Sequence, residues 1–410
     1  MWILFADPKK YGLLPPGTHL IFEEVKFYNN IAACPKFYYQ KILRLQGVQD
    51  ITPKLLIRRR EKRDLRFILV IAKGGIGDVM WTLPFIQTLK RKFPSSQIAV
   101  LTDERGLPVF KNCPYITTAI KEESWTTGNL LKTAEEIYEF GGVATIYPEL
   151  QKLDPVEAIH KIAGMKMSKL PKDNRPHLVL TAEEGNIALQ SLEKNGVNPR
   201  TDQIVILSLE SSTPNRDWPL SSWEKLSSLL ARPGRKIIWL AEKTELEDVG
   251  ILTCRCGWSA EIRTKSEIKN ISYTCPACGA AVIVEGLQKV AGVVNYAGKT
   301  SLRESWSLIA LADLFIGPNS SGMVAATALE IPTIGLFGAF DHRRRTKFYE
   351  KFTAIQGAAK CAPCEEHWTE CREGHPAPCM RDITPELVAA TAEKMILQFP
   401  RAAAGKLPTK

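Results

Sequence analysis

The stretch that decides the fold runs from Phe67 to Phe93 and reads FILVIAKGGIGDVMWTLPFIQTLKRKF. It opens with six apolar residues, which is the pattern of a buried strand. The turn KGGIG follows at residues 73–77, and Asp78 then opens a stretch with the apolar spacing of a helix. Glycine lets the backbone turn sharply and approach a ligand, and the N–H groups at a helix start attract anions. We therefore predict a strand, a ligand-binding turn and a helix.

Asp78 stands at the mouth of this predicted helix. A carboxylate in that position either caps the helix or acts as a general base, and the residues alone leave both roles open. The three glycines of the turn would bring the backbone close to a substrate, or would form an ordinary structural turn; they are Gly74, Gly75 and Gly77.

Strand and helix patterns alternate along the rest of the chain, which predicts an α/β fold with helices on both faces of parallel sheets. We expect a first Rossmann-like domain over residues 66–200, which would bind the acceptor, and a second over residues 201–400, which would bind the nucleotide sugar. The carboxyl ends of their strands would face a common cleft, lined by the turns at 74–77 and 319–322. Further strands are predicted at 97–102, 144–148, 177–180, 236–241, 292–296, 314–317 and 333–337, and another begins at residue 203 and runs into a turn of small residues.

The two ends of the chain fall outside these domains. Residues 1–65 form a basic N-terminal extension with twelve Lys/Arg against six Asp/Glu, and residues 401–410 form a tail. The whole chain carries a net charge of +10, which favours an anionic partner such as a nucleotide, a lipid surface or a nucleic acid. No apolar run is long enough to span a membrane. We expect a cytoplasmic protein, with contact to the inner membrane face left open.

Ten cysteines in a reducing compartment indicate metal ligands or free thiols rather than disulfides. Two short pairs bracket residues 251–282, where we predict a zinc ribbon inserted into the second domain. The metal ligands would be Cys254, Cys256, Cys275 and Cys278, and the zinc would be structural. The role of the ribbon could be contact with nucleic acid, contact with protein, or a structural lid on the acceptor side.

A second group of cysteines lies near the C-terminus. Either they are structural thiols or they bind a second metal ion, and the sequence leaves both interpretations open. The group comprises Cys361, Cys364, Cys371 and Cys379.

Several motifs in chain order resemble the family 9 glycosyltransferases, the lipopolysaccharide heptosyltransferase family. The turn ending in Asp78 resembles the start of that family. Four later blocks resemble its C-terminal half: AGKTSLRE at 297–304, IGPNSSGM at 316–323, LFGAFD at 336–341, and the cysteine-bearing stretch from 361 to 383. The resemblance covers about residues 66–400, apart from the predicted ribbon.

This resemblance implies two Rossmann-like domains of the GT-B type. It implies an inverting glycosyltransferase that moves a heptose or similar sugar from a nucleoside-diphosphate donor to a saccharide or lipid-linked acceptor, with no metal at the reaction centre. Asp78 would be the general base. The residues that would bind the nucleotide sugar are Gly74, Gly75, Gly77, Ser211, Ser212, Thr213, Arg216, Asn319, Ser320, Ser321, Gly322 and Met323.

The chain departs from the family pattern at two positions. Asn319 stands where the family usually has Asp, and Val324 where it usually has His. These changes, with the ribbon and the basic extension, keep a second hypothesis open: an inactive or weakly active GT-B scaffold that binds nucleic acid or a protein.

Overall fold

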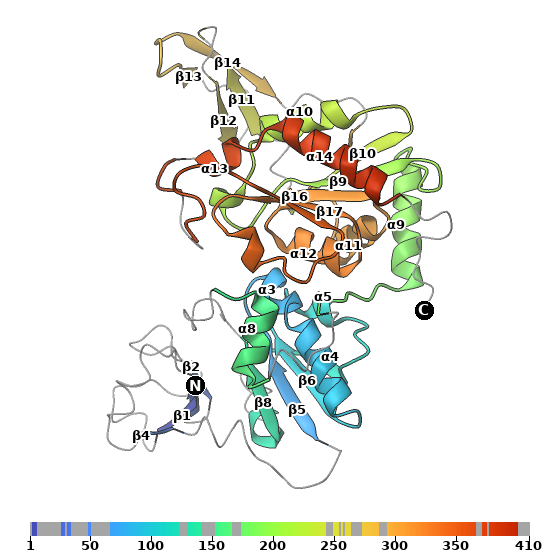
Figure 1. The fold of residues 1–410 in the computed structure, drawn as a ribbon, viewed down its shortest axis with the longest axis vertical. Helices are drawn as coiled ribbons and strands as arrows, with labels where there is room; N and C mark the ends of the chain where they lie inside the picture. Colours follow the sequence, from blue (N-terminus) through green and yellow to red (C-terminus); the bar gives the residue numbers. More distant parts are fainter. Residues whose placement is uncertain are drawn as a thin grey trace. The chain divides into compact units, whose positions relative to one another are not determined.

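The computed structural model describes residues 66–122, 130–140, 152–165, 174–242, 249–253, 256, 259–263, 273–286, 293–365, 371–374 and 377–400, and four short strands before residue 51. The chain divides into two compact units (Figure 1). The first comprises Met1–Val179 with Arg343–Phe348, and the second comprises Leu180–His342 with Tyr349–Lys410. The strand predicted at 144–148 and the tail lie outside the described residues.

The N-terminal extension contains its own antiparallel sheet, in the strand order β2-β3-β1-β4. The strands are short: β1 (Trp2–Phe5), β2 (Lys26–Tyr28), β3 (Ile31–Ala33) and β4 (Val48–Asp50).

The main sheet of the first unit is parallel and has the order β7-β6-β5-β8. Its central strands are apolar runs, so Leu69 and Leu101 are completely buried. The strands are β5 (Phe67–Ile71), β6 (Gln97–Thr102), β7 (Thr118–Lys121) and β8 (Glu136–Glu139). The described helices are α3 (Ile76–Met80), α4 (Leu83–Lys92), α5 (Leu107–Phe110) and α8 (Pro155–Ile162).

The second unit contains a parallel sheet in the order β15-β10-β9-β16-β17-β18, which is the Rossmann order 3-2-1-4-5-6. Its strands are β9 (Gln203–Ser208), β10 (Arg235–Leu240), β15 (Val293–Asn295), β16 (Leu314–Pro318), β17 (Thr333–Phe337) and β18 (Phe352–Gln356). Its helices are α9 (Ala182–Lys194), the 3-10 turn η4 (Pro214–Arg216), α10 (Leu220–Leu230), α11 (Leu302–Ala310), α12 (Ser321–Ala328), the 3-10 turn η7 (His342–Arg344), α13 (Pro378–Arg381) and α14 (Pro385–Gln398).

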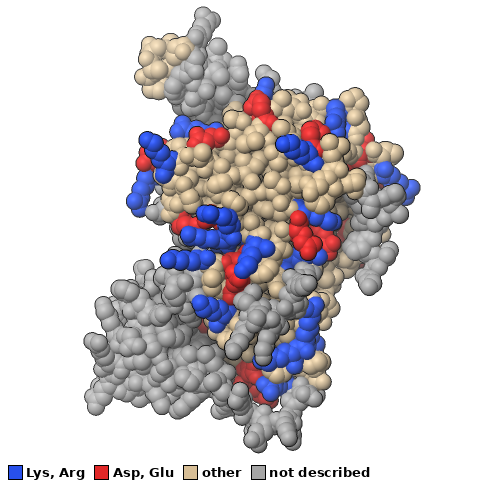
Figure 2. All heavy atoms as spheres, viewed as in Figure 1, with Lys and Arg blue, Asp and Glu red and all other residues tan. Residues whose placement is uncertain are grey.

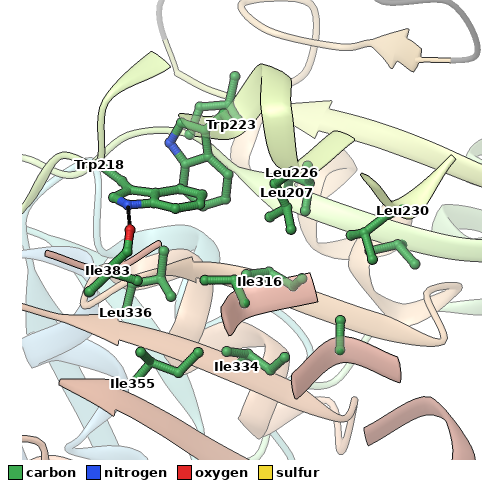
Figure 3. Packing of buried hydrophobic residues seen from close by; sticks show 14 of the residues in the cluster. Leu207, Trp218, Trp223, Leu226, Leu230, Ile316, Ile334, Leu336, Ile355 and Ile383 are labelled. Carbon is green, nitrogen blue, oxygen red and sulfur yellow. Dashed lines mark hydrogen bonds between the residues drawn. The ribbon is translucent and has the colours of Figure 1, made fainter. Parts of the chain in front are cut away.

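One face of this sheet packs under α10 and α14 and forms a large apolar core (Figure 3). Two tryptophans anchor it: the rings of Trp218 and Trp223 meet edge to face at 4.7 Å. The indole N–H of Trp218 donates to the carbonyl of Ile383 at 2.9 Å, which satisfies its buried polar group. The core therefore ties the loop after β9 to the C-terminal segment.

Two sequence expectations for the junction between the domains differ from the structure. Residues 177–180 form no strand, although Leu178 and Leu180 are buried. Helix α9 packs on α11 and belongs to the second unit, so the boundary follows Val179 rather than residue 200. The pattern at 177–180 records burial, which a hydrophobic alternation cannot distinguish from strand pairing.

The predicted ribbon region forms a separate antiparallel sheet in the order β12-β11-β14-β13. Its strands are β11 (Val249–Thr253), β12 (Ser259–Arg263), β13 (Tyr273–Thr274) and β14 (Ala281–Gly286).

Basic and acidic side chains are mixed over the described residues on the face shown in Figure 2. The net charge of +10 therefore does not mark a binding surface on that face. No helix in the described part of the chain is both long and apolar enough to cross a bilayer.

Candidate active site

The glycine turn of the first unit follows β5, at the point where the strand order reverses between β5 and β8. Ligands of open parallel sheets bind at this switch point. Gly74 has a φ of +121°, which favours glycine over any other residue. A Cβ at Gly74 would also lie 3.1 Å from the Asp78 carboxylate. The turn thus depends on glycine for its shape and for the position of Asp78.

Asp78 is exposed, and its Oδ2 accepts the backbone N–H of Gly75 at 3.0 Å. The carboxylate therefore caps the start of α3 and also faces solvent, so the capping role and the predicted role as a base are compatible. Lys73, which the sequence reasoning missed, pairs with Glu122 at 2.5 Å and ties the start of the turn to the residue that follows β7.

A stretch from the far end of the sequence also packs on this unit. Lys347 donates its backbone N–H to the buried Asp154 carboxylate at 3.3 Å and pairs through its ammonium with Glu157. The guanidinium of Arg345 lies 5.6 Å from the centre of the Trp81 ring, at the end of the helix that carries Asp78. Burial raises the pKa of Asp154 to about 6, although hydrogen bonds from Val156 and Lys347 act in the opposite direction.

In the second unit the switch point lies between β9 and β16, and the predicted donor-binding loops follow these two strands. The loop after β9 is held by Asp217, whose carboxylate accepts the N–H of Ser211 at 2.9 Å and its hydroxyl at 3.0 Å. Thr213 is buried, and Ser212 is exposed.

Arg216 joins the two loops. Its guanidinium donates to Thr213 Oγ1 at 2.7 Å and to Ser212 Oγ at 2.6 Å. It also donates to the Asn319 carbonyl at 2.6 Å, across 103 residues of sequence. The ring of Phe340, after β17, lies 5.6 Å from the guanidinium. The structure therefore brings together the loops that the sequence assigned to the donor, with Arg216 as their common contact.

The turn after β16 leads into α12, whose N-cap is Ser320 in an extended conformation. Ser321 and Gly322 are partly exposed, whereas Asn319 is buried. The predicted Met323 is also buried, as is Val324. The side chains at 323 and 324 therefore pack in the core, and only backbone groups in this part of the helix could meet a ligand.

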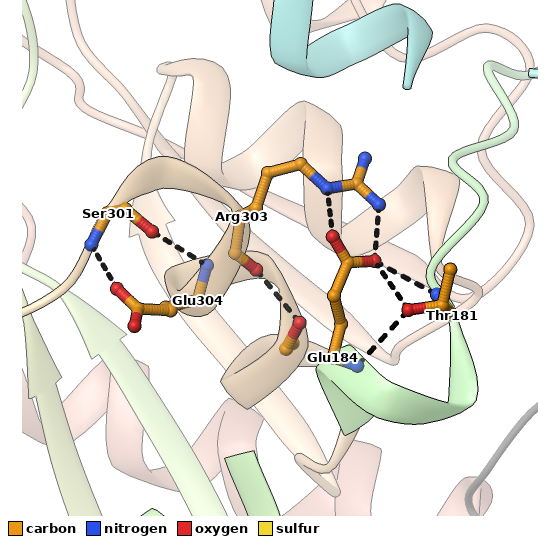
Figure 4. Close-up of polar contacts among 6 residues, drawn as sticks. Thr181, Glu184, Ser301, Arg303 and Glu304 are labelled. Carbon is orange, nitrogen blue, oxygen red and sulfur yellow. Dashed lines mark hydrogen bonds and ion pairs between the residues drawn. The ribbon is translucent and has the colours of Figure 1, made fainter. Parts of the chain in front are cut away.

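Three residues of the block AGKTSLRE make structural contacts (Figure 4). Ser301 caps α11, and its own N–H donates to Glu304 at 2.7 Å. Arg303 is buried and grips Glu184 of α9 with two bonds of 2.8 and 2.6 Å. Glu184 also accepts the N–H of Thr181 at 2.9 Å. The motif thus fastens α9 to α11.

Three cysteines of the predicted ribbon come together. The sulfur atoms of Cys256, Cys275 and Cys278 all lie within 4.8 Å of one another. Gly279, at a φ of +74°, donates its N–H to the Cys275 carbonyl at 2.8 Å, as a tight turn around a metal site requires. Three converging thiols suit zinc. The predicted fourth ligand, Cys254, lies outside the described residues.

Of the C-terminal cysteines, Cys361 and Cys364 are exposed and Cys371 is partly exposed. Cys379 is buried, and burial, followed by the neighbouring thiols of Cys361, Cys371 and Cys364, raises its pKa to about 11. Among the described residues, metal-ligand atoms converge at the ribbon cysteines and not at this group, so the structure favours the interpretation of these four residues as structural thiols.

Two parallel-sheet units, each with a polar turn at its switch point, define an α/β protein of the GT-B class. Residues 274–375 match the model of a family described as glycosyltransferase family 9 (heptosyltransferase). A search of curated protein sequences finds no match.

Solved structures share the fold at low sequence identity. The ADP-heptose lipopolysaccharide heptosyltransferase II of E. coli matches with a TM-score of 0.55 and 18% identity, over 81% of this chain and 98% of that one. The family 9 glycosyl transferase of Veillonella parvula DSM 2008 matches with a TM-score of 0.57 and 14% identity, over 81% and 97%. The iron-containing dodecameric glycosyltransferase TibC of enterotoxigenic E. coli H10407 matches with a TM-score of 0.54 and 14% identity, over 81% and 76%. These findings support a glycosyltransferase enzyme.

Proposed function

We propose that the protein is an inverting glycosyltransferase that transfers a heptose or similar sugar from a nucleoside-diphosphate donor to an acceptor hydroxyl. The observation that carries this proposal is the contact of Arg216 with the Asn319 carbonyl, which joins the loops after β9 and β16 at the switch point of the Rossmann sheet. A cytoplasmic location, with an acceptor that is a saccharide or is linked to lipid, belongs to the same proposal.

In the proposed reaction the acceptor oxygen attacks the anomeric carbon as the bond to the diphosphate breaks on the opposite face. Asp78, whose carboxylate is exposed, would take the proton of the acceptor hydroxyl. The diphosphate leaves with negative charge, which Arg216 and the first N–H groups of α12 would stabilise. No step requires a metal ion at this centre.

An ADP-sugar is the first donor to test. One similar structure, matching with a TM-score of 0.54, is described as a heptosyltransferase in complex with ADP-D-beta-D-heptose. Calorimetric titration with ADP-, GDP-, UDP- and CMP-sugars, followed by assays of slow donor hydrolysis, examines the proposal directly. Absence of both binding and hydrolysis with all four classes of nucleotide sugar would count against the proposal. Salt-dependent binding of DNA or RNA in that case would favour the scaffold hypothesis.

Arg216→Ala should weaken binding of the donor roughly 10- to 100-fold, because a charged hydrogen-bonding group contributes about 1.5–3 kcal/mol. The loss would combine direct contact with loosening of both loops. Arg200→Ala removes an exposed arginine of the same unit and serves as the matched control. Equal donor affinity in the two variants, measured by calorimetry, would remove Arg216 from the donor site.

We also propose a structural zinc ion held by Cys256, Cys275 and Cys278, with Cys254 as the fourth ligand. Cys275→Ser should release the zinc and unfold the ribbon, because so small a sheet depends on its metal. Cys113→Ser changes a thiol of the first unit and should leave zinc content unaltered. Metal analysis of both variants gives the answer; a zinc content unaffected by Cys275→Ser would refute this ligand set.

The same measurement addresses the C-terminal cysteines, since TibC is described as iron-containing. Iron or zinc that survives Cys275→Ser, and is lost in Cys379→Ser, would assign a second metal to this group.

A further inference from the structure

The turn at residues 338–342, which runs from the end of β17 into η7, is held by two residues from later in the chain. Gln356 donates to the carbonyls of Phe337 and Gly338 at 3.2 and 2.9 Å. Its own oxygen accepts the N–H of His342 at 3.3 Å. One amide side chain thus secures both ends of the turn.

Glu365 secures the middle of the same turn. Its backbone N–H donates to the carbonyl of Ala339 at 2.8 Å, and its carboxylate accepts the N–H of Asp341 at 3.0 Å. Glu365 has a φ of +56°, which is uncommon for a residue other than glycine. This conformation lets the main chain and the side chain of one residue contact the turn together.

The turn is also packed tightly against Cys379 and Met380. A Cβ at Gly338 would lie 2.7 Å from both Cys379 Sγ and Met380 Sδ, so no larger residue fits without displacement. Gly338 therefore holds the turn against the cysteine-bearing segment, while Glu365 and Gln356 fix its backbone.

The residue that the turn presents is Phe340, which is 3% exposed and lies against the guanidinium of Arg216. The Phe340 ring limits where the guanidinium can move. Arg216 in turn fixes Ser212 and the Asn319 carbonyl. The contacts form a continuous series from Glu365 through Phe340 to both donor-binding loops.

We propose that Glu365 and Gln356 are positioning residues of the donor site, which hold the 338–342 turn so that Phe340 keeps Arg216 in place. The statement that this site binds a nucleotide donor rests on the proposed function. Neither residue lies in the predicted donor-binding loops, and the sequence reasoning assigned neither of them a role.

The test compares Glu365→Ala, Glu365→Gln and the control Glu373→Ala, an exposed glutamate nearby. Glu365→Ala removes a hydrogen bond between a charged group and the turn, so it should speed hydrogen exchange of the 338–342 amides. It should weaken ADP binding by up to roughly 10-fold, the limit if the whole loss is transmitted through Phe340 to Arg216. Glu365→Gln keeps an oxygen for the Asp341 N–H and should restore most of both signals. Glu373→Ala should match wild type.

Gln356→Ala tests the second positioning residue in the same way. Its control is Gln398→Ala, which changes an exposed glutamine. Unchanged hydrogen exchange of the 338–342 amides in both Glu365→Ala and Gln356→Ala would overturn the proposal. Faster hydrogen exchange with unaltered ADP affinity would overturn it as well. A wild-type protein that binds no nucleotide would instead overturn the proposed function, and with it the donor role of the turn. The melting temperature of each variant separates these outcomes from a failure to fold.

Discussion

Asp78→Asn should lower the rate of sugar transfer by about 10²- to 10⁴-fold, the contribution expected of a general base. Asparagine cannot take the acceptor proton at neutral pH. Its side-chain oxygen can still accept the N–H of Gly75, so the start of α3 should remain intact. Donor affinity should stay close to that of wild type, because asparagine preserves the shape of the glycine turn and the other predicted donor-binding residues belong to the second unit.

Asp202→Asn is the matched control for this experiment. Asp202 likewise accepts a backbone N–H, that of Asn198 at 2.8 Å, but it precedes β9 and so lies at the opposite end of that strand from the donor loop. Single-turnover assays with a saturating donor measure the chemical step in both variants. Transfer within about threefold of wild type in Asp78→Asn would reduce Asp78 to a helix cap.

Arg303→Ala should destabilise the second unit by about 3–5 kcal/mol, the range for breaking a buried ion pair. The Arg303 side chain is 10% exposed and that of Glu184 is 13% exposed. Removal of the arginine takes two charged hydrogen bonds from the Glu184 carboxylate, which is poorly exposed to solvent. Denaturant-dependent hydrogen exchange of the α9 and α11 amides measures the free energy of unfolding of the second unit separately from that of the rest of the chain.

Arg232→Ala provides the comparison on the surface of the same unit. Arg232 pairs with Glu393 at 3.2 Å, but its side chain is 50% exposed, so the expected cost is about 0–1 kcal/mol. Similar losses of stability for Arg232→Ala and Arg303→Ala would mean that the Arg303–Glu184 ion pair does not hold α9 against α11.

The strands predicted from sequence were mostly those whose residues are almost all apolar. Buried parallel strands read as continuous hydrophobic runs, and β5, β6, β9, β10, β16 and β17 do so. The patterns missed β7, β8 and β18, each at a sheet edge. The β8 sequence, EIYE, carries charge at both ends and is too short for a periodicity to identify.

The candidate site was predictable as a set of loops but not as a set of contacts. Glycine and serine turns after apolar strands indicate where ligand-binding loops lie in such folds. Asn319 lies 103 residues from Arg216, and Glu184 lies 119 residues from Arg303; local patterns carry no information on such pairs. For this reason Arg303 could be read only as part of a motif, and Glu365 was not singled out at all.

The segment from Arg343 to Phe348 has a practical consequence for dissecting the chain. A fragment that stopped at Val179 would lack Lys347 and would leave the buried carboxylate of Asp154 without one of its two backbone donors. If the first unit binds the acceptor, as we propose, an exchange of acceptor specificity with a related enzyme would meet the same requirement. A functional graft of the amino-terminal half must carry this hexapeptide with it, although more than 160 residues separate the two pieces.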